Sequence, residues 1–150
     1  MKKVVLASLL FLWGCADAAT VAPRQNLEVF NPGTKLTVAN IFFEPDSYVV
    51  VPQYEGVIQE KANLLKRQPN LHAEVQGHAD RSGTCEFALA LAEQRAAVVA
   101  GMLTRAGAPA ERVHSVSFGR ELPLDRDYTR EADLRNSRVE IIIYAEKQNS

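Results

Sequence analysis

The chain has 150 residues and a formal net charge of −1 at pH 7. Such a mild charge gives no support to a nucleic-acid partner, which would need a basic face or stripe. A chain of this length suits one domain with a substantial hydrophobic core and leaves little room for a second one.

The first residues have the pattern of an export signal. Two lysines precede an apolar run over residues 4–13, which is too short to cross a bilayer as a helix. The run ends in Leu-Trp-Gly-Cys at 12–15, which resembles the bacterial lipobox, where the cysteine is lipidated after cleavage. We therefore expect residues 1–14 to be a lipoprotein signal peptide and Cys15 to carry acyl chains. The alternative is an ordinary secretory signal followed by a chance cysteine.

We expect residues 15–39 to be a lipid-anchored tether and residues 40–150 to be the globular domain. Residues 16–34 lack a sustained period and contain two prolines, as is typical of a linker. A short strand near 35–38 is compatible with the pattern. In Gram-negative sorting, an aspartate directly after the lipidated cysteine tends to retain a lipoprotein in the inner membrane. Ala16 has that position here, which favours the periplasmic face of the outer membrane.

The rest of the chain alternates between strand and helix patterns. Apolar alternation predicts strands, and apolar residues three or four apart predict helices. Thr84 and Gly107 have the properties of the N-cap and C′ residues of the longest helix. The expected strands are 41–43, 71–77, 112–118 and 138–145, and the expected helices are 52–68 and 85–106, with a helical turn near 131–134. This order predicts an α/β sandwich in which helices cover one face of a mixed four-stranded sheet.

One charged residue interrupts the apolar stripe of the longest helix. The stripe consists of Phe87, Leu91, Val98 and Met102. Arg95 falls inside this stripe, and an arginine on the core side of a helix is costly unless something negative meets it. The nearest candidate along the chain is Asp80. From the pattern alone, an ordinary structural ion pair and a functional pair are both open.

Four short motifs together carry a family resemblance. They are Phe43-Glu44-Pro45-Asp46-Ser47, Gly77-His78-Ala79-Asp80, Arg95-Ala96 and Asn136-Ser137-Arg138-Val139. In this order and spacing they resemble the OmpA-like peptidoglycan-binding domain over roughly residues 40–146, and most of all the family of peptidoglycan-associated lipoproteins. The resemblance implies the βαβαββ form of the sandwich predicted above.

The resemblance also implies a ligand, which is the stem peptide of peptidoglycan, bound non-covalently at meso-diaminopimelate. In the family, the residues at the positions of Asp80 and Arg95 hold this amino acid. Its free end carries an ammonium and a carboxylate on one carbon, and a carboxylate with a planar guanidinium is the smallest pair that reads both charges. By the same resemblance we expect Asp46, His78 and Arg138 to belong to the ligand site.

Three positions depart from the family pattern, and one of them is Cys85, at a first-turn helix position where close relatives often have proline. Ala88 stands where the family usually has an asparagine, and Ser137 replaces the first arginine of the usual Asn-Arg-Arg motif. We expect these differences to change the affinity of the site rather than the class of ligand.

The resemblance thus implies a lipid-anchored protein that ties the outer membrane to the cell wall, with the Tol system as a source of protein partners. The alternative is a wall-anchoring component of an envelope-spanning secretion, conjugation or motility complex. A metal site at His78 and Asp80 would need further ligands, and no other histidine has a helpful spacing. No serine or cysteine nucleophile has a recognisable base. We therefore expect no metal, no cofactor and no enzymatic activity.

Overall fold

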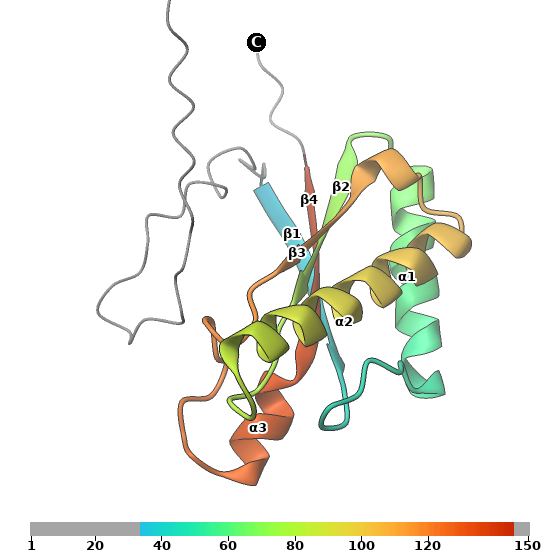
Figure 1. Cartoon of the computed structure of the whole chain (residues 1–150). Coiled ribbons are helices and arrows are strands. Elements are labelled where there is room, and N and C mark those ends of the chain that lie inside the picture. Colours follow the sequence, from blue (N-terminus) through green and yellow to red (C-terminus); the bar gives the residue numbers. More distant parts are fainter. Residues whose placement is uncertain (1–33, 146–150) are drawn as a thin grey trace, which may run out of the picture.

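The structure is a computed structural model, which describes residues 34–145 (Figure 1). The expected signal peptide, Cys15 and most of the expected tether lie outside the described residues. The described residues form one sheet with helices packed against it, which confirms the predicted fold class.

The sheet has four strands in the order β1-β4-β2-β3. They are β1 (Thr34–Phe42), β2 (Leu71–Gly77), β3 (Val113–Ser117) and β4 (Arg138–Ala145). The central strand β4 runs antiparallel to both β1 and β2, whereas β2 and β3 are parallel, so the sheet is mixed as predicted. Strand β1 is continuous from Thr34 and pairs Lys35 with Tyr144. The sheet therefore includes residues that the sequence pattern assigns to the tether.

The helices lie mostly on one face of this sheet (Figure 1). They are the 3₁₀ turn η1 (Pro52–Tyr54), α1 (Glu55–Arg67), α2 (Cys85–Arg105), the 3₁₀ turn η2 (Ala110–Arg112) and α3 (Arg130–Asn136). The predicted N-cap of α2 is confirmed, because Thr84 Oγ1 accepts a hydrogen bond of 3.1 Å from the Phe87 amide. The helical turn expected near 131–134 is the short helix α3, which leads directly into β4.

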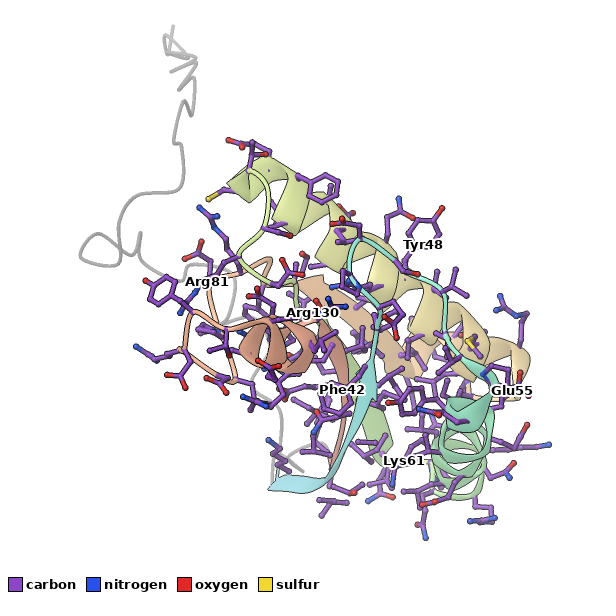
Figure 2. All side chains as sticks on the ribbon, turned by 90° about the horizontal axis from the view of Figure 1, so that it is seen from below. Phe42, Tyr48, Glu55, Lys61, Arg81 and Arg130 are labelled. Atoms are coloured by element: carbon purple, nitrogen blue, oxygen red, sulfur yellow. The ribbon has the colours of Figure 1, made fainter. Side chains whose placement is uncertain are left out.

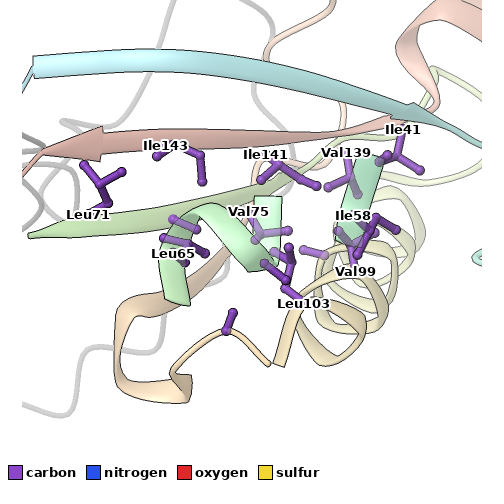
Figure 3. Packing of buried hydrophobic residues seen from close by; sticks show 14 of the residues in the cluster. Ile41, Ile58, Leu65, Leu71, Val75, Val99, Leu103, Val139, Ile141 and Ile143 are labelled. Carbon is purple, nitrogen blue, oxygen red and sulfur yellow. The ribbon is translucent and has the colours of Figure 1, made fainter. Parts of the chain in front are cut away.

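The hydrophobic core lies between the sheet and helices α1 and α2 (Figure 3). The two inner strands, β2 and β4, contribute alternate residues to the core, so that one face of the sheet is apolar. Fully buried members of the core include Ile41, Leu65, Val75, Val99, Leu103, Ile141 and Ile143.

The buried face of α2 differs from the predicted stripe. Leu91 and Arg95 are buried as expected, but Phe87 is 47% exposed. The buried line runs instead through Ala88, Leu91, Ala92, Arg95, Ala96, Val99 and Leu103. Next to Gly77 the buried line consists of Ala92 and Ala96, because the helix lies too close to the sheet there for larger residues. By length and composition alone α2 is apolar enough to cross a membrane, yet its buried residues pack as those of a core helix do.

Gly77 shows how close this approach is. A Cβ atom at Gly77 would lie 1.9 Å from the carbonyl oxygen of Ala92, a distance that no side chain tolerates. The last residue of β2 and the middle of α2 are therefore in backbone contact. This contact brings the segment that follows β2 beside Arg95, three residues further along α2.

Candidate functional site

Three chain segments meet at the end of the sheet that Figure 2 shows from below. They are the segment 43–51 after β1, the segment 78–84 after β2, and the start of β4. Backbone hydrogen bonds join them: the Phe43 amide donates to the Ser137 carbonyl, and the His78 amide donates to the Arg138 carbonyl, each at 2.9 Å. The four sequence motifs that carry the family resemblance therefore converge on one corner of the domain.

Arg95 is the centre of this corner. Its side chain is fully buried, and each of its three nitrogens donates to a backbone carbonyl from a loop. Nε donates to Ser47 at 2.7 Å, Nη1 to His78 at 3.0 Å and Nη2 to Glu44 at 3.1 Å. The guanidinium also lies over the ring of Phe43, 5.1 Å from its centroid. Arg95 thus holds the segments after β1 and β2 against α2.

The positive charge of Arg95 is only partly balanced. Burial lowers its pKa to about 10, while the negative charges of Asp80 and Asp46 act in the opposite direction. In the described part of the chain, no carboxylate forms an ion pair with Arg95. A buried guanidinium without a paired carboxylate is a strong electrostatic attractor for an anion.

Asp80 is held by serines rather than by Arg95. Its Oδ1 accepts a 2.7 Å hydrogen bond from the Ser82 amide and a second, short one from the Ser82 hydroxyl. Its Oδ2 accepts a 2.8 Å hydrogen bond from the hydroxyl of Ser137. Burial alone would raise the pKa of Asp80, but these hydrogen bonds and the charge of Arg95 outweigh it and lower the pKa below its ordinary value. Asp80 is therefore an ionised carboxylate with a fixed orientation.

The two alternatives left open for Asp80 and Arg95 can now be compared. The two residues lie in one corner and each shifts the pKa of the other, as expected. They do not form the direct structural ion pair, because each is satisfied by different hydrogen-bonding groups. The corner therefore contains two opposite charges, and each is held in place by its own hydrogen-bond partners.

Asp46 lies in the segment after β1 that meets this corner, and its negative charge acts on Arg95. It is exposed and has a φ of 54°, a left-handed conformation that few residues other than glycine adopt. This turn directs the chain so that the carbonyls of Glu44 and Ser47 both reach Arg95. Asp46 thus contributes charge and loop shape, and makes no hydrogen bond to Arg95.

The side chains of His78 and Arg138 belong to a neighbouring cluster. The His78 ring stacks on Phe118, with centroids 5.5 Å apart, and its Nε2 lies 4.0 Å from Glu140. Arg138 donates to the same carboxylate from Nε and Nη2, at 2.9 and 2.6 Å. Both ring nitrogens of His78 and Nη1 of Arg138 are buried without a hydrogen-bond partner among the described residues. His78 reaches the corner through its carbonyl, and the described Arg138 side chain makes no hydrogen bond or ion pair with Asp80 or Arg95.

Sequence reasoning missed the groups that orient the two charges. Ser82 and the carbonyls of Glu44 and Ser47 hold Asp80 and Arg95, but a backbone carbonyl has no signature in a sequence. The sequence marks Ser137 only as a departure from the family pattern. A second departure, Ala88, is buried beside Ala79 and Ala92 in a small apolar cluster.

Comparison with known proteins gives a consistent result. The model of the OmpA family matches residues 42–137. The peptidoglycan-associated lipoprotein of Agrobacterium fabrum is 38% identical over 111 residues, which cover 74% of this chain and 59% of that protein. The peptidoglycan-associated lipoprotein of Legionella pneumophila is 32% identical over 103 residues, which cover 69% and 58%. The chain thus spans less than two thirds of the length of each of these two relatives.

Solved structures agree with this result. The crystal structure of the peptidoglycan-associated lipoprotein from Burkholderia pseudomallei has a TM-score of 0.68 and 33% identity, and covers 69% of this chain and 88% of that one. The periplasmic domain of Helicobacter pylori MotB has a TM-score of 0.65 and covers 80% of this chain and 81% of that one. At 19% identity, the likeness to MotB concerns the fold alone.

Proposed function

The chain belongs to the OmpA family, and from this premise we propose that its domain binds peptidoglycan non-covalently and has no enzymatic activity. The names of its relatives support binding to peptidoglycan. The observation that carries the proposal within this chain is the fully buried guanidinium of Arg95, which no carboxylate of the described residues pairs with.

The ligand group that we propose for Arg95 is a carboxylate. A guanidinium has five N–H donors, and the three carbonyls take one from each nitrogen. One N–H on Nη1 and one on Nη2 are then left for a ligand. Two N–H groups on neighbouring nitrogens match the two oxygens of a carboxylate, in a charge-assisted contact.

The ligand group that we propose for Asp80 is an ammonium. Its two oxygens already accept three hydrogen bonds, and a carboxylate has about four acceptor positions. The serines keep the carboxylate ionised and oriented before a ligand arrives, so that binding costs little ordering. Asp46 adds a second, exposed negative charge that acts on the same corner.

An ammonium and a carboxylate on the same carbon are what the free end of meso-diaminopimelate presents. We therefore propose this amino acid of the stem peptide as the recognised group. In this arrangement His78 acts through its carbonyl, which holds Arg95. Arg138 acts through its backbone, which anchors the segment after β2.

The cellular role that we propose combines this site with the lipobox-like sequence at 12–15. Acyl chains on Cys15 would hold the protein at the periplasmic face of the outer membrane, and the bound stem peptide would connect that membrane to the wall. Partners in the Tol system are part of this proposal. The fold alone is equally compatible with a wall anchor of a larger envelope complex, but no residue of the site favours that alternative.

The test is co-sedimentation of the full-length protein with purified peptidoglycan of two types. Diaminopimelate-type wall should bind, whereas lysine-type wall should bind poorly, since lysine keeps the amine and lacks the carboxylate that Arg95 would hold. Asp80→Asn removes one charge with little change of shape, and should weaken binding by about tenfold or more. Glu93→Gln is the matched control, because it makes the same change on the exposed side of α2. Equal binding of the unmodified protein to both walls would overturn the proposal.

A further inference from the structure

A cation and an aromatic ring form a pair directly beside the proposed site. Arg81 follows Asp80 in the chain, and its guanidinium carbon lies 4.4 Å from the centroid of the Tyr128 ring. Tyr128 is 92% exposed. Tyrosine normally buries most of its ring, which supplies much of its contribution to stability. Tyr128 therefore contributes little to the core, and its position needs another explanation.

The segments that carry this pair are fixed at several points. Arg81 Nη1 donates to the Arg126 carbonyl at 3.0 Å, which ties the segment after β2 to the segment before α3. The Asn136 side chain makes two hydrogen bonds to the backbone of Asp125. It accepts one from the Asp125 amide at 2.9 Å and donates one to the Asp125 carbonyl at 2.8 Å. Tyr128 is thus presented to solvent from a braced segment.

The pair has the properties of a platform. The guanidinium of Arg81 lies over one face of the Tyr128 ring, and the high exposure of the residue leaves the other face open to solvent. An open aromatic face attracts C–H groups and flat apolar surfaces, and the phenol hydroxyl adds a donor and an acceptor. A pyranose ring offers both an apolar C–H face and hydroxyl groups.

We propose that Arg81 and Tyr128 form a second subsite, which binds a sugar ring of the peptidoglycan glycan strand. This inference rests on the proposed function, because the sugar reaches the subsite only when the stem peptide attached to it is bound at Asp80 and Arg95. The two residues that separate diaminopimelate from the sugar span about 7 Å when extended. A long arginine side chain that starts next to Asp80 covers a similar distance. Tyr128 stacks against the sugar with its open face, while Arg81 supports the ring from the other face.

The experiment compares two soluble ligands that share the same diaminopimelate stem peptide. One is the free peptide, and the other is the peptide on its disaccharide. Calorimetry with the full-length protein in detergent should give roughly two- to tenfold tighter binding of the disaccharide form, as expected for one aromatic contact. Tyr128→Ala should abolish this increment and leave the affinity for the free peptide unchanged, whereas Tyr128→Trp should retain it.

Tyr48→Ala is the matched control. Tyr48 is also exposed, at 49%, and lies on the opposite side of this end of the domain from Arg81 (Figure 2). This variant should keep the increment. Equal affinity of the unmodified protein for the two ligands overturns the sugar subsite while the proposed function stands. The sugar subsite is likewise overturned if Tyr128→Ala weakens the binding of both ligands equally. Binding of neither ligand overturns the proposed function and this inference with it.

Discussion

The hydroxyl of Ser137 donates a 2.8 Å hydrogen bond to Oδ2 of Asp80, across 57 positions of the chain. Ser137 is fully buried between α3 and β4. The family pattern usually has an arginine at this position, which would bring a positive charge to the start of β4. A neutral hydroxyl orients the carboxylate without adding a charge of its own. The charge of Asp80 therefore stays available to the ammonium that we propose as its ligand group.

Ser137→Ala should weaken binding of a diaminopimelate muropeptide and lower the stability of the domain. Loss of the hydroxyl leaves a buried carboxylate oxygen without one of its donors, at a cost of about 1–3 kcal/mol. The pKa of Asp80 should rise, because this hydrogen bond is one of those that lower it. Urea unfolding and calorimetric titration measure the two effects.

Ser117→Ala is the control for this variant. The Ser117 hydroxyl makes a hydrogen bond of the same length, 2.8 Å, but to the Leu89 carbonyl and away from Asp80. It should leave ligand affinity unchanged. If Ser137→Ala binds the muropeptide as tightly as the unmodified protein, the orienting role of the hydroxyl is wrong.

Much of the fold follows from local patterns in the sequence. Strands β2 and β4 begin and end where alternation predicts, and the cap at Thr84 follows from its side-chain chemistry. The buried face of α2 could not be read in this way. Large residues such as Phe87 dominate an apolar stripe, but next to Gly77, which touches the backbone of α2, only small residues such as Ala92 and Ala96 fit.

The sequence likewise predicts one part of the candidate site and not the rest. The family resemblance placed Asp80 and Arg95 in one corner, and the structure does bring them together. The groups that hold them come from segments distant in sequence, and three of these groups are backbone carbonyls. Only the tertiary arrangement shows that the two residues are held apart, or that the His78 and Arg138 side chains meet Glu140 instead. The ligand-binding role of all five residues stays a prediction.

Gly77→Ala should strongly destabilise the domain. The added methyl group would lie 1.9 Å from the Ala92 carbonyl oxygen, so β2 and α2 would have to separate. We expect a loss of about 3 kcal/mol or more in the free energy of unfolding. In Gly56→Ala, within α1, the methyl group would meet nothing within 4 Å, and a gain of up to about 1 kcal/mol is expected. Equal stability of the two variants would contradict the backbone contact.

Acidification should destabilise the domain through His78. Burial and then the charge of Arg138 lower its pKa from 6.5 to about 4, and Glu140 opposes them only in part. The unfolded chain therefore takes up a proton at a higher pH than the native state. The stability linked to His78 is complete above pH 6.5 and is lost as the pH falls from 6.5 towards about 4. The loss linked to Asp80 comes at lower pH, because its pKa lies below 3.8.

His78→Phe separates the pH-dependent stability linked to His78 from that linked to Asp80. Phenylalanine can keep the stacking on Phe118 but cannot bind a proton. The difference in unfolding free energy between about pH 7 and about pH 5 should be smaller in this variant than in the unmodified protein. An identical difference would show that another group causes the loss.

Cys15→Ser should release the protein from membranes. This prediction rests on the lipobox-like sequence at 12–15, which lies outside the described residues. A serine cannot be acylated in the manner of a lipoprotein cysteine, and the apolar run before it is too short to span a bilayer. Fractionation of cells should find the variant in the soluble periplasm. Full recovery with outer membranes would refute the lipid anchor.

Arg95→Ala should lower stability as well as binding. The variant leaves three loop carbonyls without their donor and a cavity under the corner, so we expect a loss of about 3 kcal/mol or more. Loss of binding in this variant alone would therefore not identify a ligand contact.

Arg95→Lys is the sharper variant, because it keeps a positive charge and most of the buried volume. The three carbonyls are spread around the plane of the arginine guanidinium, and the single ammonium of a lysine cannot donate to all of them. It also cannot bind a carboxylate with two parallel hydrogen bonds. We expect the lysine variant to be more stable than the alanine variant in urea unfolding. It should nevertheless bind the diaminopimelate muropeptide at least about tenfold more weakly than the unmodified protein. Its preference for diaminopimelate-type over lysine-type wall should shrink accordingly. If Arg95→Lys binds both walls as the unmodified protein does, a point charge is sufficient, and the two-pronged grip on the ligand carboxylate is wrong.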